Sequence, residues 1–129
     1  MDFNDTEKEA TFRSKVKEFL DVNAQKRSTK SANSKTGGAP GAPETLRGKE
    51  MEALAKAKEW QAKKAKAGMA AILWPKEFGG YGGTPIEQVI YQQEEHNYFV
   101  HSGYFEIGIG MLGPTMMVWG KEEDKKKYL

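Results

Sequence analysis

The sequence predicts an all-α fold, a helical bundle with a long flexible loop after its first helix. Three patterns support this prediction. Apolar residues recur at helical spacing near the N-terminus, strong helix formers fill the middle of the chain, and a Thr-Pro-x-Glu helix start begins at Thr84. No two segments show the apolar and polar alternation of paired strands, so no sheet is expected.

The first predicted helix has one apolar face. Its apolar residues fall at positions i, i+4, i+7 and i+8: Phe12, Val16, Phe19 and Leu20. Asn4 or Asp5 is expected to cap its start. Glu7 and Glu9 fall in the first turn, where the helix dipole favours negative charge. So narrow a stripe is not stable alone, which predicts packing against a partner surface.

A flexible loop is expected over residues 23–46, which are rich in Ser, Gly, Pro and Lys and lack a hydrophobic anchor. The second helix is expected over about 48–67, because Ala, Lys, Glu, Leu, Met and Gln dominate that segment. Gly68 stands where a left-handed residue ends many helices. Three residues mark the predicted buried side of this helix: Met51, Leu54 and Trp60.

The second half of the chain predicts a buried connector over residues 69–83 and then several shorter helices. Thr84, Pro85 and Glu87 form a capping box with proline at the first helical position, so a helix is expected from there to about residue 98. Further helical stretches are expected over about 102–112, from Pro114 to residue 119, and over 122–129.

Composition limits the classes of function. The 129 residues fit one domain, and the absence of cysteine excludes disulfides, thiol nucleophiles and thiolate metal sites. A net charge of +2 provides no broad field for nucleic acid. The most apolar stretch, residues 103–120, contains Glu106 and Pro114, so no membrane span is expected.

Several motifs resemble catalytic or binding signatures. Gly108, Gly110 and Gly113 spell GxGxxG, but no strand pattern precedes them and only 16 residues follow, so a nucleotide loop is not expected. Their small size instead indicates close approach by a helix or a ligand tail. The Glu-x-x-His metal motif of helical bundles would need Glu at position 93, which is Gln93, so no metal site is assigned.

Two further groups of residues are candidates for catalysis: the pair Ser102 and His101, and Glu106. Ser102 and His101 are adjacent in sequence, so their side chains point apart and form no nucleophile pair. Glu106 lies alone in an apolar stretch, and burial there would raise its pKa. Such a carboxyl group more often pairs with a lysine or faces a solvent channel. No catalytic residue is assigned within the chain.

Two stretches carry a family resemblance: AGMAAILWPKEFGGYGGTP at 67–85 and GKEEDKKKYL at 120–129. In their order and spacing they resemble the N-terminal helical domain of the acyl-CoA dehydrogenase family. Two positions depart from the family pattern: Met69 stands where the family commonly has an aromatic residue, and Asp124 stands where it usually has Gln. The loop followed by Leu46-Arg47-Gly48 is similar to the branch that acts on bulky acyl-CoAs, including steroid side-chain types.

The resemblance implies an FAD-dependent enzyme that oxidises the Cα–Cβ bond of an acyl-CoA thioester. In the family a glutamate removes the α-proton and FAD accepts the β-hydride. That glutamate and most FAD contacts belong to a middle β-domain and a C-terminal helical domain, which are absent from this sequence. The chain alone is therefore expected to be inactive. The resemblance places a helix beside the acyl chain, which gives four candidate substrate-binding residues: Tyr104, Ile107, Gly110 and Met111.

The resemblance also implies partners: an acyl-CoA, the remaining domains of the enzyme, an electron-transfer partner, and further subunits in a homo- or hetero-oligomer. A role in fatty acid metabolism in the cytoplasm or another soluble intracellular compartment would follow. Two alternatives stay open: a stand-alone helical protein-interaction domain that uses residues 103–119, and a weak nucleic-acid binder that uses lysines within 26–35 and 63–66. The dehydrogenase interpretation predicts an exposed apolar patch at 103–119.

Overall fold

The computed structural model describes residues 4–27 and 44–129, with side chains from residue 48 onward in the second range. The expected loop at 23–46 lies mainly at residues 28–43, outside the described residues. The elements in chain order are α1 (Glu7–Asn23), β1 (Gln25–Lys26), α2 (Glu44–Lys66), the 3-10 helix η1 (Lys76–Phe78), α3 (Pro85–Glu95), β2 (Tyr98–Phe99), the π-helical turn η2 (Gly108–Leu112), α4 (Gly113–Trp119) and α5 (Glu122–Tyr128). The mainly helical fold predicted from sequence is confirmed.

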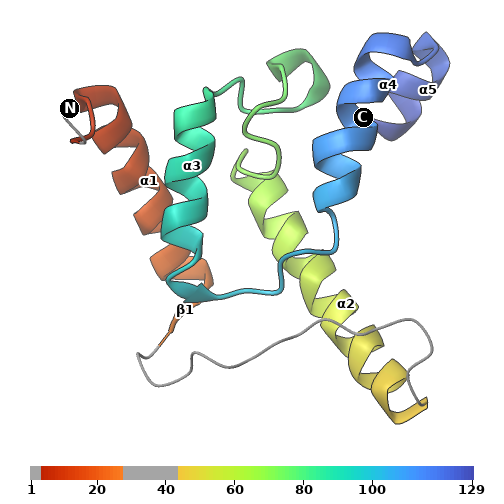
Figure 1. Cartoon of the computed structure of the whole chain (residues 1–129), viewed down its shortest axis with the longest axis horizontal. Helices are drawn as coiled ribbons and strands as arrows, with labels where there is room; N and C mark the ends of the chain where they lie inside the picture. The colour runs from red at the N-terminus through yellow and green to blue at the C-terminus, as the bar shows by residue number, and fades with distance from the viewer. Residues whose placement is uncertain (1–3, 28–43) are drawn as a thin grey trace.

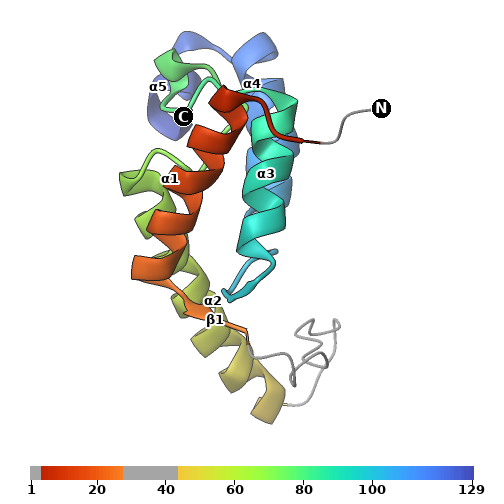
Figure 2. The same cartoon turned by 90° about the vertical axis from the view of Figure 1, so that its left-hand side faces the viewer.

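Helices α1 and α3 lie side by side in both views, and α2 runs beside them (Figures 1 and 2). Helices α4 and α5 stand apart at the other side of the molecule in Figure 1. The core fills the space between α1, α2, α3 and the connector after α2. Its buried residues are Phe12, Val16, Leu20, Trp60, Met69, Ile72, Ile90, Tyr91 and Tyr98. The core thus belongs mainly to the first 100 residues.

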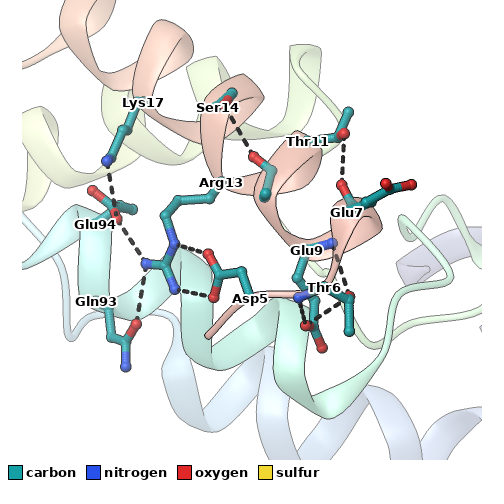
Figure 3. Close-up of polar contacts among 11 residues, drawn as sticks. Asp5, Thr6, Glu7, Glu9, Thr11, Arg13, Ser14, Lys17, Gln93 and Glu94 are labelled. Atoms are coloured by element: carbon teal, nitrogen blue, oxygen red, sulfur yellow. Dashed lines mark hydrogen bonds and ion pairs between the residues drawn. The ribbon is translucent and has the colours of Figure 1, made fainter. Parts of the chain in front are cut away.

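The start of α1 differs from the expected cap. Thr6, not Asn4 or Asp5, is the N-cap, because its hydroxyl oxygen accepts the Glu9 amide and the Glu9 carboxylate accepts the Thr6 amide at 2.7 Å. This is a reciprocal capping box that the sequence analysis missed. Asp5 instead accepts hydrogen bonds from Arg13 (Figure 3). The expected acidic first turn, with Glu7 and Glu9, is confirmed.

A two-residue antiparallel ladder contradicts the expectation of no sheet. Gln25 pairs with Phe99 and Lys26 with Tyr98. Strands this short show no periodicity, so the sequence could not reveal them. The Arg27 Nε–H also donates to the Tyr98 carbonyl at 2.8 Å, which extends the contact beyond the ladder.

Helix α2 begins at Glu44, before the expected residue 48, and ends at Lys66; Gly68 has the expected left-handed φ of 71°. The expected buried side is correct for Trp60 but wrong for Met51, which is 67% exposed. The beginning of α2 extends past the ends of α1 and α3 (Figure 1). Apolar residues there have no helix to pack against, which explains the error.

The connector and α3 follow the predicted pattern more closely. Residues 69–83 contain turns, η1 and buried apolar residues rather than a strand. Thr84 and Glu87 form the expected capping box, with Pro85 in the first turn of α3. The helix ends at Glu95, short of the expected residue 98, because Tyr98 joins the β-ladder. No helix in the described part of the chain is long and apolar enough to span a bilayer.

Candidate functional site

Residues 106–119 form one continuous helix in place of the two stretches expected from the sequence. It contains η2 and α4, and Leu112 and Gly113 both keep right-handed helical dihedrals where the two meet. Pro114 was expected to open a new helix because proline cannot donate a backbone hydrogen bond. The π-helical turn just before it accommodates the proline without a break.

Six large apolar side chains in this helix and just before it are exposed. We call them together the outer apolar face: Tyr104, Ile107, Met111, Leu112, Val118 and Trp119. Ile107 is 68% exposed, Met111 65% and Trp119 83%. Exposed large apolar side chains are therefore present within 103–119, as expected. Contiguous exposed apolar surface marks a site of interaction with protein, ligand or membrane.

The four expected substrate-binding residues separate into two groups. Tyr104, Ile107 and Met111 lie on the outer apolar face. Gly110 lines a cavity on the inner side of the same helix, together with Ile109 and Pro114. A Cβ atom added at Gly108 or Gly110 would meet nothing within 4 Å, so both glycines leave open space beside the helix.

The cavity on the inner side has a volume of about 430 Å³. Its walls come from α2, residues 69–74, α3 and residues 101–114. The lining residues 69–74 are mostly apolar, and the other segments also contribute polar side chains: Gln61, Lys64, Gln88, Gln92, Glu95, His101, Ser102 and Glu106. Sequence reasoning did not identify this cavity, because its walls come from four separate segments.

Glu95 is the centre of the polar end. Its Oε1 accepts the Trp60 indole N–H at 2.9 Å and the Tyr91 hydroxyl at 3.0 Å, and the Lys64 ammonium lies 3.8 Å away. Burial, and secondarily the Glu95 charge, raise the pKa of Tyr91. These contacts tie α2 to α3, so we interpret the cluster as structural.

Glu94, the neighbour of Glu95, is also used in packing. It is 8% exposed, and its Oε1 accepts the Arg13 Nη1–H at 2.8 Å, with the Lys17 ammonium 3.9 Å away (Figure 3). Arg13 also donates to Gln93 Oε1 at 3.1 Å. Residues 93–95 therefore join α3 to α1 and α2. Among the described residues, no group of His, Asp or Glu is arranged to hold a metal ion.

Glu106, His101 and Ser102 line the cavity, and all three are exposed. The exposure of Glu106 agrees with the interpretation that its carboxyl group faces solvent rather than an apolar interior. Glu106 is the first residue of the helix 106–119. None of the three has the neighbours that a nucleophile or general base needs.

The GxGxxG motif is a helical turn rather than a nucleotide loop. The Gly113 amide donates to the Gly108 carbonyl, five residues back, which is the π-helical pattern. The Trp74 indole N–H donates to the Ile109 carbonyl at 2.8 Å. A Cβ at Gly113 would lie 2.1 Å from Trp74 Cζ2, so the third glycine is required by the tryptophan ring. Sequence analysis missed Trp74, although a tryptophan next to a proline and a paired-glycine turn was a visible signal.

Comparison with known proteins decides the family. The sequence model of the family described as acyl-CoA dehydrogenase, N-terminal domain, matches residues 6–129. The chain belongs to the acyl-CoA dehydrogenase family. It is similar to acyl-CoA dehydrogenase FadE29 of Mycobacterium tuberculosis, with 42% identity over 62 residues, 48% of this chain and 16% of the relative.

Another acyl-CoA dehydrogenase, IpdE1 of Mycobacterium tuberculosis, is 28% identical over 82 residues, 64% of this chain and 21% of the relative. The chain thus spans only 16–21% of the length of these curated relatives. The fold is also similar to a chain in the crystal structure of the ChsE4-ChsE5 complex from Mycobacterium tuberculosis. The superposition covers 100% of this chain and 28% of that chain, with a TM-score of 0.58 and 22% sequence identity. That likeness supports the acyl-CoA dehydrogenase N-terminal fold.

Proposed function

We propose that this chain forms one wall of the acyl-binding site in an FAD-dependent enzyme that dehydrogenates an acyl-CoA thioester between Cα and Cβ. The observation that carries the proposal is the outer apolar face, where Ile107 and Met111 are one helical turn apart and both exposed. Family membership supplies the reaction class. The same proposal includes an electron-transfer partner, assembly of the enzyme into a homo- or hetero-oligomer, and a soluble intracellular location.

An acyl chain fits this surface physically. Each buried methylene contributes about 0.8 kcal/mol to binding, so an apolar wall gives affinity that grows with chain length. Ile107 and Met111 offer branched and flexible apolar side chains, and no Cβ occupies the space beside Gly108. The wall therefore selects by shape rather than by hydrogen bonding.

FAD itself is not matched by the described residues of this face. A flavin dinucleotide needs hydrogen-bond donors for its ring and cations for its pyrophosphate. The outer apolar face, as defined above, contains neither Lys nor Arg. This face therefore supplies no FAD contact, and most of the residues that hold FAD are proposed to lie outside this chain.

The test uses the full-length enzyme that carries this chain. Met111→Ala shortens an exposed side chain of the outer apolar face, and should lower kcat/KM for long acyl-CoAs about tenfold relative to short ones. Met51→Ala is the matched control, because Met51 is 67% exposed, close to the 65% of Met111, but lies on α2. An unchanged chain-length preference in Met111→Ala contradicts the acyl wall.

A second measurement tests the reaction class. Addition of an acyl-CoA to the purified enzyme without oxygen should bleach the absorbance of a bound flavin. A protein that purifies without flavin and is not reduced by any acyl-CoA would instead support the stand-alone interaction domain. The exposure of Val118 and Trp119 favours that alternative, because these residues extend the apolar surface beyond the proposed acyl contacts.

A further inference from the structure

The Ile109 carbonyl, in the middle of the helix 106–119, loses the partner that a regular helix would give it. In an α-helix the Ile109 carbonyl would accept the amide of residue 113, but the Gly113 amide donates to Gly108. In a continued π-helix it would accept the amide of residue 114, which is proline and has no N–H. Both backbone partners of the Ile109 carbonyl are therefore lost at the same place.

Trp74 supplies the missing donor from another part of the chain. Its indole N–H reaches the Ile109 carbonyl at 2.8 Å. The same ring lies against Gly113, where an added Cβ would come within 2.1 Å of Cζ2 and 2.7 Å of Cη2. Trp74 thus makes two contacts with the π-helical turn: its N–H donates to the Ile109 carbonyl, and its ring packs against Gly113.

The turn decides which residues share a face. Successive residues of an α-helix advance by about 100°, so one extra residue in a turn rotates everything after it relative to everything before it. Ile107 precedes the turn η2 and Val118 and Trp119 follow it. Loss of the turn would change how these side chains line up along the outer apolar face.

We propose that Trp74 is a positioning residue for acyl-group selection. It holds η2 in its π-helical form from the inner side of the helix, and thereby sets the shape that the outer apolar face presents to an acyl chain. This inference rests on the proposed function for its effect on specificity. Trp74 is not part of the outer apolar face, because its ring lies against Ile109 and Gly113.

The first test is Trp74→Phe in the full-length enzyme, which keeps an aromatic ring but removes the N–H. The ratio of kcat/KM values for a long and a short acyl-CoA should change about tenfold, mainly through KM. Trp60→Phe is the matched control, since it removes an equivalent hydrogen bond to Glu95 at 2.9 Å in the core. If both variants shift the ratio equally, or neither does, the positioning role is overturned.

The second test uses the notch at Gly113. Gly113→Ala should shift the same ratio, because the new methyl group collides with the six-membered part of the indole. Phenylalanine lacks the atoms that correspond to Cζ2 and Cη2, so Gly113→Ala added to Trp74→Phe should cause little further change. Additive effects of the two substitutions would contradict a shared contact.

A third measurement separates this inference from the proposed function. The chain has three tryptophans, and exchange of their indole protons with solvent can be followed by NMR. The Trp74 and Trp60 protons should be protected, while that of Trp119, which is 83% exposed, should exchange fast. Exchange of Trp74 as fast as Trp119 overturns the inference. Protection of Trp74 in a protein that oxidises no acyl-CoA contradicts the proposed function alone.

Discussion

The pair α1–α3 and the helix 106–119 are built in opposite ways. Helices α1 and α3 each begin with a reciprocal capping box, share the buried core and are joined by the Arg13–Glu94 ion pair. The helix 106–119 contains a π-helical turn and exposes most of its large apolar residues. The first region is stabilised by its own contacts, whereas the second presents a surface for something else.

The largest expected difference concerns apolar truncation. Leu20→Ala removes a side chain that is fully buried, and should lower the free energy of unfolding by about 2–5 kcal/mol. Met111→Ala, on the outer apolar face, should change it by no more than about 0.5 kcal/mol in the isolated chain. Urea denaturation followed by circular dichroism measures both values. Equal losses would show that the two regions are packed alike.

Breaking an ion pair should also lower the free energy of unfolding more in the α1–α3 region than in α5. Arg13→Ala leaves the carboxylate of Glu94 without its close partner, and should cost about 2 kcal/mol of unfolding free energy, somewhat less than at a fully buried pair. Lys125→Ala breaks the 2.9 Å pair with the exposed Glu122 in α5, and should cost about 0.5 kcal/mol or less. The same urea experiment tests both. A larger loss for Lys125→Ala would reverse the ranking of the two regions.

The smallest expected effect is on pH dependence. The hydrogen bonds from Arg13 hold the pKa of Asp5 below its ordinary value of 3.8. The resulting stabilisation is therefore present above about pH 4 and is lost as the pH falls through the lowered pKa. Asp5→Asn should flatten this acid part of the stability profile. Thermal unfolding between pH 2 and 6 measures it, and an unchanged profile would mean that Asp5 contributes nothing to the α1–α3 junction.

The sequence predicted the elements whose signals are local. The Thr84 capping box, the glycine after α2 and the apolar stripe of α1 each depend on residues within two helical turns, so periodicity and capping rules sufficed. The family was also recognisable, because its motifs occupy two continuous stretches. Features that join distant segments were not predictable in this way.

Three of those features depend on tertiary contacts. The β-ladder pairs residues 25–26 with 98–99, the cavity draws walls from four segments, and Trp74 lies 35 positions from the carbonyl it satisfies. Met51 was expected on the buried side of α2, but its side chain is 67% exposed, because no neighbouring helix of the described chain reaches it. The candidate acyl residues Tyr104, Ile107, Gly110 and Met111 remain predictions.

The extra residue in η2 gives this helix an unusual form of adaptability. Deleting one residue between 108 and 112 would remove the wide turn and leave Val118 and Trp119 in their present direction relative to Ile107, because the turn absorbs one residue. Conversion of η2 to a plain α-helix without a deletion would instead turn both side chains about the axis by about 100°. The lining of the wall can therefore be changed by the type of turn alone, without replacing any apolar side chain. Trp74 and Gly113 limit that freedom, since they fit the π-helical form.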